Sequence, residues 1–364
     1  MRSKRPIIIA AGGTGGHIFP GLALAKELKD RSKDVIWLGT KKGLEAKLVK
    51  DASIDIKWIS VPRLRGFGYL SWFLPPFKLF FSIIQTLVIF YRCRPSVVVG
   101  FGGFVSGPGG LAAWLMRKPL LIHEQNAIAG SSNRVLSKFA SKIFTAFPNS
   151  FPSKVKSILI GNPIRKSILN TKPPEKRFSE RANKEKIINI LILGGSQGAK
   201  ALNKKIPMLL KEIKLYTDIS VWHQVGQDMA CVESSYQDLK IKAKVEVFIS
   251  NIAEAYSWAD IVFCRSGALT ISELEAVGVG AILIPLPNSI DDHQYKNAIN
   301  FCSNGAGLII PEDKLESDES HEKIFSILKN KNKLINFANR ARNNSKREAT
   351  KILADTCIDM AGER

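Results

Sequence analysis

The chain has 364 residues, more than one hydrophobic core usually supports, so two domains are expected. Apolar residues make up 45% and charged residues 23%, which excludes a largely disordered chain. Lys and Arg outnumber Asp and Glu by 53 to 32, and the net charge of +21 predicts anionic partners: nucleic acid, lipid headgroups or phosphorylated substrates. The five scattered cysteines form no C-x-x-C pair, which indicates reduced thiols rather than a disulfide framework or a cysteine-rich zinc site.

The first predicted element is a β-strand in the apolar run that begins at Pro6. This run leads directly into glycines, so it is not a signal peptide. The motif GGTGGH (residues 12–17) follows the strand and precedes a helical pattern, where backbone N–H groups and the helix dipole favour an anion. It matches neither G-x-G-x-x-G nor a P-loop, so standard dinucleotide or ATP binding is not predicted.

The same plan of apolar run, glycine cluster and helical pattern occurs at residues 6–28 and again at 187–213. Continuous apolar strands that alternate with helices predict parallel sheet covered on both faces, hence an α/β protein with two Rossmann-like domains. The polar segment 171–186 contains a Pro pair and is typical of an interdomain connection. The other expected strands are residues 35–38, 96–99, 120–123, 245–249, 261–264 and 281–285.

The most apolar window, residues 79–91, is too short to span a bilayer and predicts a buried or interfacial helix. Two more glycine clusters follow strands, GFGGFVSGPGG at 100–110 and GGSQGA at 194–199, and each is a candidate phosphate loop. HEQN (residues 123–126) lies at the carboxyl end of a strand, where open α/β sheets bind ligands, and it lacks zinc-protease spacing.

Two motifs in the second half also follow strands. CRSGALTISELEAVG (residues 264–278) opens a helix whose start suits a nucleotide phosphate, and Glu273 can accept hydrogen bonds from ribose hydroxyls. In DDHQYKNA (residues 291–298), His293 or Gln294 is placed to reach a sugar or to cap a helix.

Together with GNPIR (residues 161–165), these motifs resemble in order the bacterial peptidoglycan glycosyltransferases of glycosyltransferase family 28. Members of that family transfer N-acetylglucosamine from UDP-N-acetylglucosamine to lipid I, the undecaprenyl-diphosphate-linked muramyl-pentapeptide, and so form lipid II. The resemblance implies the glycosyltransferase B fold, two Rossmann-like domains that face across a cleft. It implies an acceptor- and membrane-binding domain at residues 1–164, a UDP-sugar-binding domain at 165–341, and a C-terminal helix at 342–364 that packs back on the first domain.

The resemblance also implies site residues by motif. His17 is the candidate catalytic base and Glu124 is its rival. Gly13, Gly102, Gly103 and Ser106 are expected at the acceptor diphosphate. The expected donor contacts are Thr14, Gly15, Gly16, Asn126, Arg165, Ser196, Ile249, Arg265, Ala268, Leu269, Thr270, Ile271, Ser272, Glu273 and Gln294.

An inverting displacement needs a base near the attacking C4 hydroxyl of the muramyl sugar and positive dipoles on the leaving diphosphate. Helix N-termini and Arg265 supply the latter, so neither a metal nor a cofactor is expected. Basic and aromatic residues that alternate before and within the apolar window suit an anionic bilayer surface. The expected membrane contacts are Trp72, Phe73, Phe77, Lys78, Phe80 and Phe81.

The expected location is therefore the cytoplasmic face of the bacterial inner membrane, as a peripheral protein, with other cell-wall synthesis proteins as candidate partners. Alternatives are a UDP-N-acetylglucosamine 2-epimerase or a transferase of another sugar with the same architecture. A nucleic-acid-binding protein would explain the charge but not the glycine loops, and no nucleic-acid-binding motif occurs. A nicotinamide dehydrogenase is disfavoured because its glycine fingerprint is missing.

Overall fold

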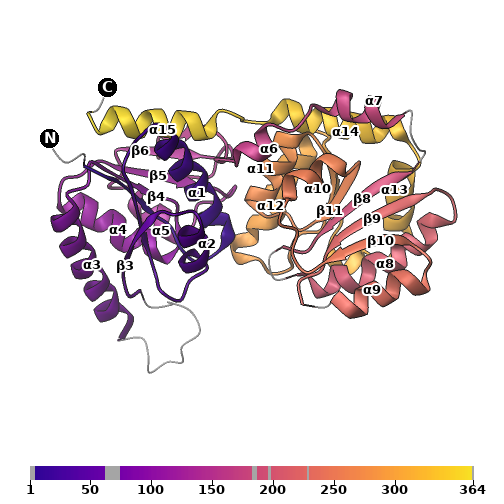
Figure 1. Cartoon of the computed structure of the whole chain (residues 1–364), viewed down its shortest axis with the longest axis horizontal. Coiled ribbons are helices and arrows are strands. Elements are labelled where there is room, and N and C mark those ends of the chain that lie inside the picture. Colours follow the sequence, from indigo (N-terminus) through magenta and orange to yellow (C-terminus); the bar gives the residue numbers. More distant parts are fainter. Residues whose placement is uncertain (1–4, 62–73, 183–186, 196–197, 228, 363–364) are drawn as a thin grey trace. The chain divides into compact units, whose positions relative to one another are not determined.

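The computed structural model describes residues 5–61, 74–182, 187–195, 198–227 and 229–362. The chain forms two compact units, Met1–Arg165 with Lys346–Arg364, and Lys166–Ser345 (Figure 1). The polypeptide therefore passes between the units twice. The sequence predicted domain boundaries after residues 164 and 341, and the boundaries in the structure lie after Arg165 and Ser345.

The first unit is built on a seven-stranded sheet with the order β3-β2-β1-β4-β5-β6-β7, and every neighbouring pair is parallel. Its central strands are short apolar runs, buried along their whole length, as expected for a sheet covered on both faces. The strands are β1 Ile7–Ala10, β2 Val35–Gly39, β3 Asp55–Trp58, β4 Val97–Gly100, β5 Leu120–Glu124, β6 Lys142–Thr145 and β7 Ile158–Leu159.

Helices cover both faces of this sheet. Ile7 and Ile9 point to a core shared with α1, α2 and α15, whereas Ile8 and Ala10 point to a core shared with α3, α4 and α5. The last helix of the chain, α15, packs on the first, α1 (Figure 1). The helices are α1 Gly15–Asp30, α2 Glu45–Asp51, α3 Leu74–Cys93, α4 Gly103–Leu115, α5 Ser131–Leu136 and α15 Ala349–Met360.

The second unit repeats this topology in a six-stranded parallel sheet with the order β10-β9-β8-β11-β12-β13. In both sheets the order reverses direction after the first strand, which is the Rossmann pattern with a topological switch point. The strands are β8 Ile188–Leu193, β9 Ile219–Gln224, β10 Lys242–Glu246, β11 Ile261–Cys264, β12 Gly280–Leu283 and β13 Gly307–Ile309.

One face of the second sheet packs on α8, α9, α13 and α14 around Ile190, Ile192 and Phe263. The α11 helix packs on α14, α12 and α6. The helices are α6 Lys166–Leu169, α7 Pro174–Ala182, α8 Lys200–Lys214, α9 Met229–Asp238, α10 Ile252–Trp258, α11 Ala268–Val277, α12 His293–Ser303, α13 Asp318–Leu328 and α14 Lys331–Asn344, with short 3-10 turns η2 Ile290–Asp292 and η3 Glu312–Lys314.

The two Rossmann-like domains and most central strands match the prediction. Five strands were not expected, namely β3, β6, β7, β9 and β13, and two expected elements differ in their bounds. The strand expected at 245–249 is β10, Lys242–Glu246, so the expected range lies mostly in the loop that follows it. The helix expected at 79–91 is α3, which begins at Leu74 and takes both prolines into its first turn, where a missing N–H costs no helical hydrogen bond. Among the described helices, none is long and apolar enough to cross a membrane.

Candidate functional site

The glycine loops that follow β1 and β4 lie side by side at the switch point of the first sheet. Phe101 donates its backbone N–H to the carbonyl of Ala10 at 3.0 Å. Gly103 has a φ of +73°, and a side chain there would collide with the carbonyl oxygen of Gly12. Only glycine allows this approach, so the clusters at 12–17 and 100–110 form one surface at the carboxyl edge of the sheet.

A buried carboxylate, which the sequence did not suggest, organises the first loop. Glu45 is fully buried, and its Oε1 accepts hydrogen bonds from the N–H and hydroxyl of Thr40 at 3.1 and 2.7 Å. Its Oε2 accepts from the N–H of Gly13 at 3.3 Å. Gly13, an expected diphosphate ligand, thus already donates its N–H within the protein.

Ser106, an expected contact of the acceptor diphosphate, has a structural role in this conformation. The side chain is fully buried, and its hydroxyl lies 2.7 Å from the carbonyl oxygens of both Ala10 and Gly102. It therefore joins β1 to the start of α4. In this conformation the hydroxyl is not presented to a ligand.

His17, the candidate base, is half-buried in the first turn of α1 beside the second glycine loop. Its Nδ1 lies 2.9 Å from Oε1 of Gln125. Nε2 of Gln125 lies 3.1 Å from Nδ1 of His123, whose Nε2 lies 2.9 Å from the carbonyl oxygen of Gly161. Burial lowers the pKa of His123 to about 4, so its ring is neutral at physiological pH.

Glu124, the rival base, is buried and its carboxylate is fully used. Oε1 accepts from the backbone N–H and the amide of Asn126 at 2.9 and 3.3 Å. Oε2 accepts from the N–H of Gly130 at 3.0 Å and from the amide of Asn133 at 2.9 Å. Four donors occupy the carboxylate, which is the pattern of a residue that shapes a loop rather than one that accepts a substrate proton.

The other expected contacts of the first unit lie at its carboxyl edge or at its end. Thr14 is exposed at the N-terminus of α1, and no described side chain caps that helix. Asn126 is half-buried beside Glu124. Arg165 ends the unit with its guanidinium 5.0 Å from the centre of the Phe19 ring, a cation–π distance. Gly15 and Gly16 form the first turn of α1.

In the second unit, Gln224 ties together the loops that follow β8 and β10. It is buried at the end of β9, donates to the carbonyl of Gly195 at 2.9 Å, and accepts from the N–H of Ile249 at 2.9 Å. Ile249 itself is buried, whereas the neighbouring Phe248 is exposed. The expected donor contact Ser196 lies outside the described residues.

The start of α11 is the second candidate anion site. Gly267 precedes the helix in extended conformation. One turn on, buried Glu273 accepts a hydrogen bond at 3.1 Å from the hydroxyl of Tyr256, which is also buried. Ile271 is fully buried, so its side chain belongs to the core. Ala268 and Ser272 are buried, and Leu269 and Thr270 are half-buried.

Arg265 and Gln294 are held by neighbouring loops. The guanidinium of Arg265 donates to the carbonyls of Ile284 and Pro285, both at 3.2 Å, and forms an ion pair with Glu312. The side-chain oxygen of Gln294 accepts from the N–H of Leu286 at 3.0 Å. Both side chains therefore stabilise the segment after β12 in this conformation.

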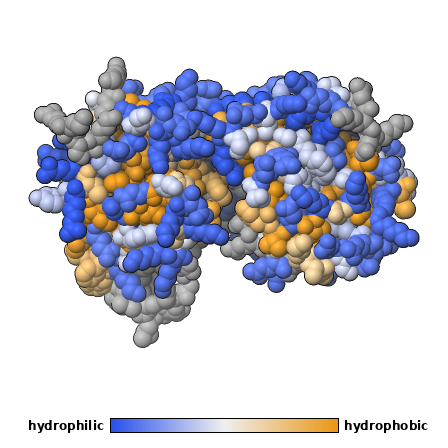
Figure 2. All heavy atoms as spheres, in the orientation of Figure 1, coloured by the Kyte–Doolittle hydropathy of each residue, from blue (hydrophilic) through white to orange (hydrophobic). Residues whose placement is uncertain are grey.

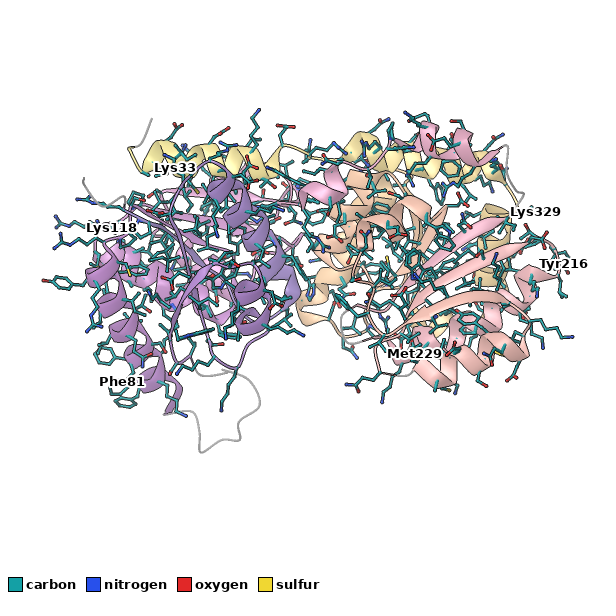
Figure 3. The ribbon with its side chains drawn as sticks, in the orientation of Figure 1. Lys33, Phe81, Lys118, Tyr216, Met229 and Lys329 are labelled. Atoms are coloured by element: carbon teal, nitrogen blue, oxygen red, sulfur yellow. The ribbon has the colours of Figure 1, made fainter. Side chains whose placement is uncertain are left out.

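An exposed apolar stripe runs along α3. Phe81 projects outward at the lower left of Figure 3, and Figure 2 shows hydrophobic surface there, over the first turns of the helix. Lys78 is exposed beside this stripe, whereas Trp72 and Phe73 lie outside the described residues. The exposed apolar residues of α3 recur at helical spacing: Phe77, Phe80, Phe81, Ile84, Val88 and Tyr91.

Sequence reasoning missed the side chains that hold the site residues in place. Gln125 lay inside a recognised motif, HEQN, but nothing in the sequence distinguished its role from that of its neighbours. Glu45, Gln224 and Tyr256 lie in ordinary helical or strand patterns and carried no signal. Their contacts join residues far apart in the chain.

Two Rossmann-like domains, each with glycine loops and polar side chains at the carboxyl edge of a parallel sheet, are the architecture of the glycosyltransferase B class. Residues 7–145 match the glycosyltransferase family 28 N-terminal domain, and residues 189–354 match the family 28 C-terminal domain. The chain belongs to glycosyltransferase family 28.

Curated relatives cover nearly the whole chain. A protein from Nitrosococcus oceani, named UDP-N-acetylglucosamine--N-acetylmuramyl-(pentapeptide) pyrophosphoryl-undecaprenol N-acetylglucosamine transferase, is 43% identical over 356 residues, 98% of each chain. A Coxiella burnetii protein of the same name is 44% identical over 352 residues, 96% of this chain and 97% of its own. The crystal structure of Acinetobacter baumannii MurG has a TM-score of 0.83 and 38% identity, and covers 98% of this chain and 99% of its own.

Proposed function

We propose that the protein transfers N-acetylglucosamine from UDP-N-acetylglucosamine to the C4 hydroxyl of the muramyl sugar of lipid I, with inversion, and so forms lipid II. The observation that carries this proposal is the 43% identity, over 98% of both chains, to an enzyme named for this transfer. The first unit would bind the acceptor and the second unit the sugar nucleotide. The glycine motifs proposed for both roles lie in the regions that match the two family 28 domains.

The second unit would bind the donor. The N-terminus of α11 presents the positive end of a helix dipole to a diphosphate, and the loop after β8 offers backbone N–H groups of the same kind. The buried carboxylate of Glu273, oriented by Tyr256, would accept hydrogen bonds from the ribose hydroxyls. Ser196, Arg165, Arg265 and Gln294 remain predicted donor contacts.

The first unit would bind the acceptor and supply the base. Of the two candidates, His17 is half-buried, and within the described residues its Nε2 has no hydrogen-bond partner. Glu124 is buried and accepts four hydrogen bonds. A base must reach the proton that it removes, so this role is assigned to His17, with Glu124 as the residue that shapes the 124–133 loop. Gly102 and Gly103 would bring backbone close to the acceptor diphosphate.

The α3 stripe would place the first unit on an anionic bilayer, where lipid I resides. Phe77, Phe80 and Phe81 are 67, 58 and 61% exposed, which is unusual for large apolar side chains unless another surface covers them. Lys78 on the same helix, and Lys118 beyond the end of α4 (Figure 3), add positive charge. We infer a peripheral position on the cytoplasmic face of the inner membrane, which this surface and the proposed acceptor support.

The deciding experiment follows labelled N-acetylglucosamine from its UDP donor to a lipid I analogue, with UDP release measured in parallel. We expect the lipid-linked disaccharide to form in the same amount as the UDP that is released. UDP release without disaccharide would contradict the proposed acceptor and favour a hydrolysing epimerase. No UDP release under these conditions would contradict the proposed donor.

A further inference from the structure

Three polar groups link His17 to the backbone of the first unit in one continuous chain, which we call the His17 chain: Gln125, His123 and the carbonyl of Gly161. We propose that Gln125 and His123 are positioning residues that fix the tautomer of His17, so that its proton lies on Nδ1 and its lone pair on Nε2. The catalytic meaning of this arrangement rests on the proposed function.

The carbonyl of Gly161 sets the direction of the hydrogen bonds in the His17 chain, because a carbonyl oxygen can only accept a hydrogen bond. Nε2 of His123, 2.9 Å away, must therefore donate. The ring is fully buried and its pKa is lowered to about 4, so it is neutral and has a single N–H. Its Nδ1 must accept.

The amide of Gln125 is oriented by the same logic. One end of it lies 3.1 Å from Nδ1 of His123 and 2.9 Å from the carbonyl oxygen of His123, and both of these atoms are acceptors. That end must be the NH2 group, which leaves the amide oxygen 2.9 Å from Nδ1 of His17. An oxygen of this kind cannot donate, so Nδ1 of His17 carries the proton and Nε2 of the neutral ring carries the lone pair.

The anchor of the chain is itself fixed. Gly161 has a φ of +88°, and a side chain there would collide with Lys346. Lys346 is the residue at which the polypeptide returns to the first unit. The side-chain amide of Asn162 donates to the carbonyl of Gln125 at 3.2 Å. Gly161 is thus held against Lys346, and the next residue, Asn162, is bonded to Gln125, all within one unit.

This tautomer suits the proposed transfer. The acceptor hydroxyl gives its proton to Nε2 of His17 while its oxygen electron pair forms the new bond to the anomeric carbon. The bond from that carbon to the diphosphate breaks, and its electrons leave with UDP. The imidazolium that results still donates from Nδ1 to Gln125, so the ring keeps its orientation through the step. Gln125 and His123 act through His17.

The tautomer can be measured without turnover. Long-range proton–nitrogen correlation spectra of the five histidine rings, with His17 assigned by its loss in His17→Ala, distinguish a protonated from an unprotonated nitrogen. We expect protonated Nδ1 for His17 and protonated Nε2 for His123 in the unmodified protein. A His17 ring protonated on Nε2 would overturn the proposal, whatever reaction the enzyme catalyses.

Gln125→Met tests the link, because it keeps the length of the side chain and removes both polar ends. We expect the Nδ1–H signature of His17 to be lost and kcat to fall about 10- to 100-fold, with the KM for the donor within about threefold of the original. Gln237→Met, at an exposed position on α9, is the matched control and should leave both unchanged. An unchanged His17 signature in Gln125→Met would refute the role of Gln125.

A double-mutant cycle separates positioning from a general structural effect. In a His17→Ala background, Gln125→Met should lower kcat by less than about twofold further, because its partner is already gone. An equal loss in both backgrounds would mean that Gln125 does not act through His17. If Gln125→Met does not fold, His123→Phe, which keeps an aromatic ring beside Phe101, provides the second variant and should also weaken the Nδ1–H signature.

Discussion

Substitutions of His17 and Glu124 should affect different properties of the protein, because the two side chains have different environments. His17→Ala removes the proposed base, so kcat should fall about 100-fold with little change in donor KM or in stability. His321→Ala, which removes a histidine on α13 in the second unit, should leave kcat unchanged. Steady-state kinetics of the two variants make the comparison. Near-normal turnover in His17→Ala would remove it from the mechanism.

Glu124→Gln should instead lower stability. Each carboxylate oxygen of Glu124 meets two donors, so the substitution puts an NH2 group against two donors, and charged acceptors contribute more than neutral ones. We expect the free energy of unfolding of the first unit to fall by about 2–4 kcal/mol. Hydrogen exchange in β1 and β4 measures it. Normal exchange with lost activity would point to Glu124 as a direct participant.

Two buried histidines make stability depend on pH. Burial lowers the pKa of His123 to about 4 and that of His223 to about 3, below the value of 6.5 for an unfolded chain. The unfolded state therefore binds more protons below pH 6.5, and stability is lost as the pH falls. Between pH 6.5 and 5 the loss should be about 1.6 kcal/mol for each ring. Denaturation midpoints at these pH values test this, and His223→Phe should reduce the dependence in the second unit alone.

At the scale of elements, we predict that the exposed apolar stripe on α3 binds to membranes. Phe81→Glu puts a charge in an exposed apolar surface, so binding to anionic vesicles should weaken about tenfold, because an apolar contact is replaced by charge repulsion. Leu215→Glu is the matched control, since Leu215 is 78% exposed in the second unit. Vesicle co-sedimentation compares the two. Equal binding by both variants would exclude α3 as the contact.

Strands that are apolar runs were predicted, whereas β3, β6, β7, β9 and β13 were not, and all five of these lie at or next to the edge of a sheet. β1 and β11 are continuous apolar runs beside glycine loops, and β8 is interrupted only by Asn189. β3 reads DIKW and contains two charged residues, so neither an apolar run nor a clean alternation marks it. Edge strands are buried less completely, and their pairing depends on neighbours that are distant in the sequence.

The candidate site was predictable as a set of loops, but not as a set of contacts. Glycine clusters at strand ends located the switch points, because each cluster and its strand are adjacent in the sequence. The roles of Ser106, Glu45 and Gln125 depend on hydrogen bonds to residues 96, 32 and 108 positions away. No window of sequence contains both ends of such a bond.

For the whole molecule, the two units should respond separately to core substitutions. Leu353→Ala, in α15, removes a fully buried side chain from the first unit, and Leu334→Ala, in α14, removes one that is 3% exposed from the second. Each should cost about 2–4 kcal/mol in its own unit. Hydrogen exchange should rise in β1 and β4 for the first variant and in β8 and β11 for the second. Equal loss in both units would mean that they unfold as one.

The return of α15 to the first unit also orders the events of synthesis. A ribosome that has made residues 1–165 has synthesised all seven strands of the first sheet but not Leu353, Ala354 and Cys357, which complete its core against α1. The second unit is continuous from Lys166 to Ser345 and is fully translated earlier. The half of the protein that is made first therefore receives the last part of its core only after the other half has been synthesised, and until then the α1 face of its sheet lacks α15.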